Sequence, residues 1–295
     1  MGQTSSSNQT VHYFSEKNPN STNTSGSSHR DLVYSSARFS EMPIYNFATK
    51  ETKLPSKIDL RVTACFPYLP PKDQGSEGAC VTYAIGSAIE CAQRRKRIPI
   101  TDAWDPDIDG HFREAFTVAV ASDASVSNTS VSNKSTSSKD SSDYGQSTNS
   151  NATSRKQEDG ITFAEAAEEF VKQSNGVVKF YRLDTGLLNF KKCLHSGYPF
   201  VFGFTVTKRM RQWQNSESQQ KQSDYVLPDF SEDDAVDGYH SVTAFGYDDS
   251  RSGGVFIVRN SWGRGWGDRG HFYMTYQTVC NHTAVQDAMI VDLNQ

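Results

Sequence analysis

The segment GYHSVTAFGYDDSRSGGVFIVRNSWGRGWG, residues 238–267, holds two runs of β-branched and aromatic residues around a turn rich in Gly, Ser and Asp. Such runs favour β-strands, and a turn of this composition favours a hairpin between them. A third run of the same kind, GHFYMTY, follows at residues 270–276. The runs at 241–247, 254–260 and 270–276 therefore predict an antiparallel meander.

This hairpin predicts that two polar residues lie next to each other in space. Antiparallel pairing about a turn centred on residue 251 joins residues whose numbers sum to about 500 to 502. His240, just before the first run, and Asn260, at the end of the second, satisfy that sum. We expect the two residues to be neighbours at the open end of the hairpin.

A helix is predicted to start at Cys80, the last residue of the Gly-containing stretch QGSEGAC at 74–80. Small and apolar residues recur there along one helical stripe: Ala84, Ile85, Ala88, Ile89 and Ala92. Basic residues at 94–97 suit the negative end of the helix dipole, and Pro99 ends the pattern. Cys80 then lies where free backbone N–H groups and the positive dipole end favour a thiolate.

The segments between these two motifs alternate between helical and strand patterns. Residues 161–174 predict an amphipathic helix, 177–183 a strand, 187–197 a short helix ending at Gly197, and 198–206 a strand. The apolar stripe of the first helix is expected to contain Phe163, Ala166, Ala167, Phe170 and Val171.

Two segments have compositions that cannot supply a core. Residues 1–28 contain 16 Ser, Thr or Asn, and residues 121–158 contain 21. Because such segments bury too little apolar surface to offset chain entropy, we expect both to be disordered. The sequence thus predicts a mostly disordered tail over residues 1–55 and one globular domain over 56–295 with an insertion at 121–158.

The charge and hydropathy of the sequence argue against a nucleic-acid-binding protein and against a membrane-spanning segment. The net charge is −4 and no dense basic stripe is present, so nucleic acid is not an expected partner. No apolar run approaches the roughly 18 residues of a membrane span.

The N-terminal sequence carries a different signal. No apolar stretch typical of a secretory signal follows Met1, so we expect an intracellular, cytoplasmic protein that is not secreted. MGQTSS fits the acceptor pattern for a myristoyl group on Gly2, although a Ser/Thr-rich tail also meets this loose pattern by chance. A single acyl chain without a polybasic patch predicts weak, reversible membrane association.

The spacing of the cysteines matches no common metal-binding or redox motif. They occur at Cys65, Cys80, Cys91, Cys193 and Cys280, with no CxxC pair and no metal-ligand spacing to histidine. We expect five reduced thiols, no metal and no cofactor. Cys91 and Cys193 are interpreted as packing residues.

Four polar residues together make a plausible catalytic set. Cys80 is a candidate nucleophile, His240 its general base, and Asn260 the residue that orients the imidazole. The side-chain amide of Gln74 and the backbone N–H of Cys80 are candidate donors to an oxyanion. Each residue alone has an ordinary explanation, such as burial or helix capping, but the combination in this order favours catalysis.

These motifs resemble those of the papain-like (cathepsin-like) cysteine peptidases. The similarity rests on QGSEGAC before a helix, on GYHSVTAFGYDD, on FIVRNSWGRGWGDRGHFYM and on KKCLHSGYPFVFGFTV. It covers roughly residues 56–292 apart from the insertion, and is greatest to the branch that lacks an aromatic residue after the catalytic Cys. The resemblance implies an α+β fold of two subdomains, a mainly helical half with Cys80 and a β-rich half with His240 and Asn260, separated by the active-site cleft.

The resemblance also implies individual roles. Gln74 would be the oxyanion residue, Cys80 the nucleophile and His240 the general base and acid, with Asn260 as orienter and Trp262 as a hydrophobic lid over the His–Asn hydrogen bond.

The sequence departs from the family pattern at several positions. Glu77 stands where secreted relatives have a disulfide Cys, and Val81 replaces the usual aromatic residue. The usual Cys-Asn-Gly-Gly substrate loop is missing, and Gly160 is the candidate replacement for substrate binding. No long helical prosegment is recognisable, although a short pro- or regulatory segment within residues 31–55 remains an alternative.

Three functions are compatible with this set. The first is an intracellular cysteine endopeptidase, a hydrolase of protein or peptide substrates that works through an acyl-thioester. The second is a catalytically silent, membrane-tethered scaffold with the same fold, and the retained set of four residues weighs against it. The third is acyl transfer or ligation by the same thioester, which the sequence does not separate from hydrolysis.

Overall fold

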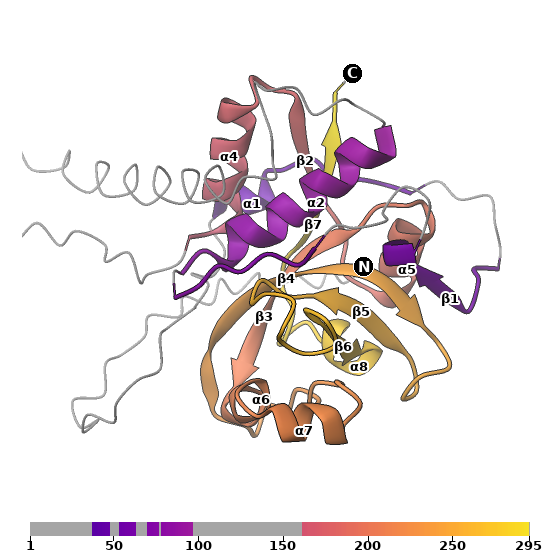
Figure 1. The fold of residues 1–295 in the computed structure, drawn as a ribbon. Helices are drawn as coiled ribbons and strands as arrows, with labels where there is room; N and C mark the ends of the chain where they lie inside the picture. Colours follow the sequence, from indigo (N-terminus) through magenta and orange to yellow (C-terminus); the bar gives the residue numbers. More distant parts are fainter. Residues whose placement is uncertain (1–36, 48–52, 63–69, 77, 97–160, 295) are drawn as a thin grey trace, which may run out of the picture.

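The computed structural model describes residues 37–47, 53–62, 70–76, 78–96 and 161–294 (Figure 1). Gly2, Cys65, Glu77 and Gly160, which the sequence predictions name, lie outside these ranges. The insertion at 121–158 and most of the tail lie outside them as well.

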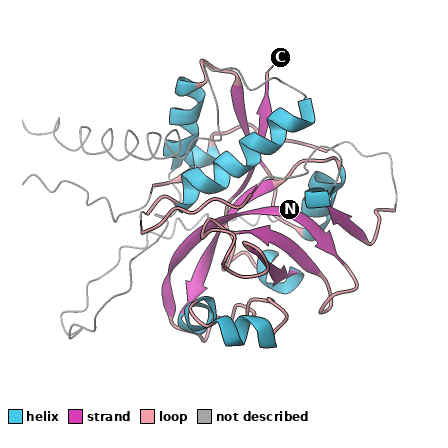
Figure 2. Ribbon diagram, in the orientation of Figure 1, coloured by secondary structure: helices cyan, strands magenta, loops and turns pink. Residues whose placement is uncertain are grey.

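One antiparallel sheet forms the centre of the described chain (Figure 2). Its strands follow the order β2-β7-β3-β4-β5-β6, and β1 pairs separately with β4. The strands are β1 Lys57–Asp59, β2 Val178–Arg182, β3 Phe200–Thr207, β4 Val236–Asp248, β5 Val255–Arg259, β6 His271–Thr275 and β7 Ala288–Leu293. The predicted meander is confirmed, because β4 pairs antiparallel with β5 and β5 with β6.

Helices pack around this sheet, and the predicted α+β class is confirmed. They are α1 Ala37–Ser40, α2 Cys80–Lys96, α4 Phe163–Gln173, α5 Leu187–His195, α6 Lys208–Gln214, α7 Glu217–Gln222 and α8 Tyr276–Val279, with a 3-10 turn at Leu60–Val62. Within the described residues, no helix has both the length and the apolar character needed to cross a bilayer.

The long helix α2 is buried against the sheet over most of its length. Its small residues, including Ala84 and Ala88, allow a close approach to β4, where the Thr243 hydroxyl donates to the Ala84 carbonyl oxygen over 2.8 Å. One apolar cluster joins α2, α4 and part of the sheet, and a second contains α5, α6 and the aromatic residues of β3. The bond from Thr243 to Ala84 places the first turns of α2 beside the middle of β4.

Two details differ from the sequence prediction. β4 begins at Val236, so His240 lies inside a strand and not before it. Val171 was expected on the buried stripe of α4 but is 38% exposed, while Phe163, Ala166, Ala167 and Phe170 are buried. Val171 lies at the edge of a stripe that those four residues already fill, and it borders a pocket described below.

The buried cysteines outside the predicted catalytic set serve packing. Cys91 and Cys193 are fully buried in the second apolar cluster, and burial raises the pKa of the Cys193 thiol well above its ordinary value. No disulfide joins the four cysteines of the described ranges, Cys80, Cys91, Cys193 and Cys280.

Candidate active site

Cys80 is the first residue of α2. The carbonyl oxygen of Ala79 accepts the backbone N–H of Tyr83 at 3.1 Å, which closes the first helical turn. The N–H groups of that turn therefore point out of the helix start, beside Cys80. The Cys80 side chain is fully buried, so it is removed from bulk water.

The loop before Cys80 is held to the loop after β5 by backbone hydrogen bonds. The N–H of Gln74 donates to the Ser261 carbonyl at 2.9 Å, and the N–H of Gly263 donates to the Lys72 carbonyl at 2.9 Å. Asp73 and Trp262 form an antiparallel bridge between these two bonds. The two loops thus behave as a short ladder that joins the Cys80 side of the site to the Asn260 side.

Ser261 orients the side chain of Gln74. Its hydroxyl donates a short hydrogen bond to Oε1 of Gln74, and both side chains are buried. Because the amide oxygen is engaged by Ser261, the amide nitrogen is directed away from it. This orientation fits the predicted role of Gln74 as an N–H donor.

The imidazole of His240 is fixed by Asn260. A backbone N–H can only donate, so the Asn260 atom that lies 2.8 Å from the Ser261 nitrogen is the side-chain oxygen. The same oxygen lies 2.8 Å from Nε2 of His240, which therefore carries the proton of the neutral ring. Nδ1 then holds the basic lone pair.

The predicted meeting of His240 and Asn260 occurs, but through a different register. Thr243 lies opposite Arg259, so the ladder carried one step further puts Asn260 opposite Val242. His240 is two residues from Val242 on the same face, a diagonal neighbour of Asn260. The pairs next to the turn, such as Asp248 with Val255, have numbers that sum to 503, so the turn is centred later than residue 251. A bulge between Ala244 and Gly246 lowers the sum to 502 and so brings Asn260 one residue closer to His240.

Aromatic rings surround the imidazole. The Trp262 ring stacks on His240 with centroids 4.8 Å apart and an interplanar angle of 29°. Phe204, on β3, meets it edge-on with centroids 5.9 Å apart. His240 is 1% exposed, so its hydrogen bond to Asn260 is shielded from competing water.

A buried group of charges lies behind these loops. Glu90 on α2 lies 3.6 Å from the amino group of Lys72 and 4.0 Å from the guanidinium of Arg259. Burial lowers the pKa of Arg259, and the charge of Glu90 opposes that effect. These contacts link α2, the loop before Cys80 and the end of β5, which carry or adjoin Cys80, Gln74 and Asn260.

The structure brings Gln74, His240, Asn260 and Trp262 into one connected group. Cys80 belongs to an apolar cluster against which Tyr239, the neighbour of His240, is packed. Ser261 was not predicted, although its place between Asn260 and Trp262 in the NSW triplet was an available signal.

Comparison with known proteins finds similar sequences and similar folds. The sequence profile of the papain family cysteine proteases matches residues 190–292. Across nearly the whole chain, the structure is similar to xylellain, a cysteine protease from Xylella fastidiosa, with a TM-score of 0.62 at 18% identity over 90% of this chain and 97% of that one. The fold is papain-like.

Other papain-like relatives are more distant in structure or match shorter stretches. A procathepsin B of Trypanosoma congolense has a TM-score of 0.56 at 14% identity, covering 91% of this chain and 88% of that one. An uncharacterised peptidase C1-like protein of Acanthamoeba polyphaga mimivirus is 33% identical over 109 residues, 37% of this chain and 32% of that protein. Cysteine proteinase 3 of Entamoeba histolytica is 51% identical over 35 residues, 12% of this chain and 11% of that protein. The chain therefore matches about a third or less of the length of these curated relatives.

Proposed function

We propose that the chain is a cysteine endopeptidase that hydrolyses peptide bonds through Cys80, His240 and Asn260. The observation that carries the proposal is the bond from Nε2 of His240 to Asn260, which fixes the tautomer of a buried imidazole. The position of Cys80 at the start of a helix supports the same function. The papain-like fold supports it further.

The proposed reaction begins with a proton transfer. Nδ1 of His240 takes the proton of the Cys80 thiol, while Nε2 keeps its proton and its bond to Asn260. The thiolate attacks the peptide carbonyl, and the imidazolium then protonates the departing amine. Water, deprotonated by His240, hydrolyses the acyl-thioester, which releases the acid and restores the thiol.

The tetrahedral intermediates need hydrogen-bond donors for their oxyanion. The Gln74 amide nitrogen, directed by Ser261, and the Cys80 backbone N–H supply them in this proposal. Donors held in advance need not reorganise during the reaction, so the bond from Ser261 to Gln74 contributes to rate as well as to structure.

Covalent labelling tests the nucleophile. A thiol-directed epoxide should add one equivalent to the wild-type chain at Cys80, and Cys80→Ala should lose both the label and the cleavage of a peptide library. Cys280→Ala is the matched control, because burial raises the pKa of that thiol to about 11 and it should react slowly. A wild-type chain that takes no label, or a Cys80→Ala chain that still takes it, would favour a silent scaffold.

We further propose that the protein works in the cytoplasm and associates weakly with membranes through a myristoyl group on Gly2. The sequence motif at Gly2 and the lack of a disulfide among the described cysteines support this. An N-terminal peptide with unmodified Gly2, isolated from cells that contain the transferase, would contradict the acylation.

A further inference from the structure

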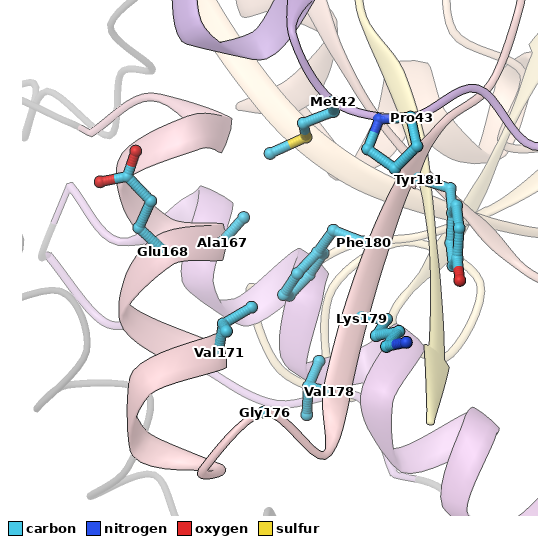
Figure 3. A pocket seen from close by; sticks show the side chains of 10 residues that line it. All are labelled: Met42, Pro43, Ala167, Glu168, Val171, Gly176, Val178, Lys179, Phe180 and Tyr181. Carbon is cyan, nitrogen blue, oxygen red and sulfur yellow. The ribbon is translucent and has the colours of Figure 1, made fainter. Parts of the chain in front are cut away.

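An apolar pocket of about 640 Å³ lies between α4, β2 and the segment around Met42 (Figure 3). Its wall is hydrocarbon from three segments of the chain: Met42, Pro43, Ala167, Val171, Val178 and Phe180. None of these residues belongs to the proposed catalytic set. The volume lies within the range of roughly 300–1,000 Å³ typical of ligand sites.

The polar residues at this pocket do not form a charged site. Figure 3 shows the Glu168 carboxylate directed away from Phe180, and Lys179 and Tyr181 on the other side of the β2 ribbon. The lining residues include one acidic side chain, Glu168, and one basic side chain, Lys179, so the pocket carries no excess charge that would favour an anionic or a cationic ligand. Val171, at 38% exposure, leaves an opening toward solvent. The pocket therefore fits an uncharged hydrocarbon chain whose attached end lies outside.

The myristoyl group proposed on Gly2 is such a chain, and the described residues that follow it in sequence begin close to this pocket. The described residues begin at Ala37, five positions before Met42 in the pocket wall, and thirty-five positions separate Gly2 from Ala37. At ~3.3–3.6 Å per residue that length reaches at most on the order of 120 Å, more than enough to bring Gly2 to the pocket. A group tethered this way has an effective concentration on the order of millimolar.

The N-terminal segment is also anchored at the pocket. The Pro43 carbonyl accepts the N–H of Arg182 at 2.8 Å, and the N–H of Tyr45 donates to the Arg182 carbonyl at 2.9 Å. These bonds hold residues 43–45 along the edge of β2, so Met42 is fixed at the pocket mouth.

From these contacts we infer that the pocket binds the myristoyl chain of Gly2, an inference that rests on the proposed acylation. In the bound state the acyl chain is hidden from membranes, and in the released state it inserts into them. A myristoyl chain binds bilayers with a constant of only about 10⁴ M⁻¹, so an internal site at millimolar effective concentration competes with the membrane. Membrane association then depends on how often the chain leaves the pocket.

Vesicle binding by the acylated full-length chain tests this inference. The protein is co-expressed with the myristoyltransferase, acylation is verified by mass spectrometry, and binding to phosphatidylcholine vesicles is measured by sedimentation at about 0.1 mM accessible lipid. A released chain is about half bound under these conditions. Val171→Asp places a carboxylate at the pocket opening and should raise the bound fraction at least about fivefold over the wild type.

Leu187→Asp is the matched control, because Leu187 has the same 38% exposure and lies on α5 away from the pocket. It should leave vesicle binding unchanged. Equal binding by all three proteins, or a Gly2 that is never acylated, overturns the inference.

If Val171→Asp does not fold, NMR on the wild type with a labelled acyl chain tests the inference instead. A contact between the Met42 methyl and the terminal methyl of the acyl chain is expected. The absence of this contact would contradict binding of the acyl chain in the pocket. Epoxide labelling of Cys80 is measured in the same samples. Because labelling tests the proposed nucleophile and vesicle binding tests the acyl pocket, either proposal can fail without the other.

Discussion

The buried His271 should make the stability of the fold depend on pH in the weakly acidic range. It begins β6, is 7% exposed, and its Nδ1–H donates to the Arg269 carbonyl oxygen at 3.2 Å. Burial, together with the positive charges of Arg259 and Arg61, lowers the pKa of His271 from 6.5 to about 3. The folded chain therefore keeps this imidazole neutral where the unfolded chain protonates it.

The sign follows from proton binding. Between about pH 6.5 and pH 3 the unfolded state binds more protons at this position, so the free energy of unfolding falls as the pH falls. The full stability is present above the unfolded pKa of about 6.5, and the loss is complete below the folded pKa of about 3. At pH 5 the difference is roughly 1.5 pH units at about 1.4 kcal/mol each, or about 2 kcal/mol.

Guanidinium unfolding at pH 5.0 and pH 7.5 measures this effect, in a Cys80→Ala background that avoids self-cleavage. His271→Gln should reduce the loss of stability between the two pH values by about 2 kcal/mol, whatever its effect at either pH alone. The exposed His282 offers a control, and His282→Gln should keep the wild-type pH dependence. An unchanged pH dependence in His271→Gln would refute the reasoning.

Two further substitutions test the site and the sheet. Ser261→Ala should lower kcat/KM roughly tenfold, because Gln74 loses the hydrogen bond that directs its amide. Cys80 should still react with the epoxide in this variant. A kcat/KM equal to that of the wild type would show that other contacts orient Gln74. Gly246→Ala should destabilise the fold by about 2 kcal/mol or more in chemical unfolding, because the added methyl meets the Ile58 carbonyl where β1 crosses β4. Gly265→Ala meets no atom within 4 Å and should cost less than about 0.5 kcal/mol, so equal losses would contradict the steric argument.

Local patterns in the sequence predicted much of this fold. The stripe after Cys80 gave α2, and the alternation of β-like runs with turns gave the meander. These features depend on neighbours close in sequence, where helix and strand periods are readable. The sequence patterns did not predict strand β7, which lies between β2 and β3, or the short helices α6 to α8. The residues of these elements pack against distant parts of the chain.

Symmetric pairing about the hairpin turn predicts that His240 lies near Asn260, and the two side chains are in hydrogen-bond contact. The observed ladder is nevertheless displaced by two residues from the predicted one. The displacement comes from the turn, because the numbers of the pairs next to it sum to 503 and centre it between residues 251 and 252. The bulge between Ala244 and Gly246, where β1 lies against Gly246, moves Asn260 one residue back toward His240. No pattern within the hairpin reports a contact with a strand nearly two hundred residues earlier, so the bulge was not predictable from the hairpin alone.

The role of Ser261 explains why the site is a unit and not a set of separate residues. Its backbone N–H fixes the Asn260 oxygen that holds His240, while its hydroxyl holds Gln74 and its carbonyl accepts the Gln74 backbone N–H. A single residue thus connects the residues proposed for proton transfer to the residue proposed to bind the oxyanion. A sequence motif assigns roles to the residues expected to contact the substrate. It therefore does not reveal the role of Ser261, which acts only through its neighbours. The connection depends on the pairing of the two loops, which joins residues almost two hundred positions apart in the sequence.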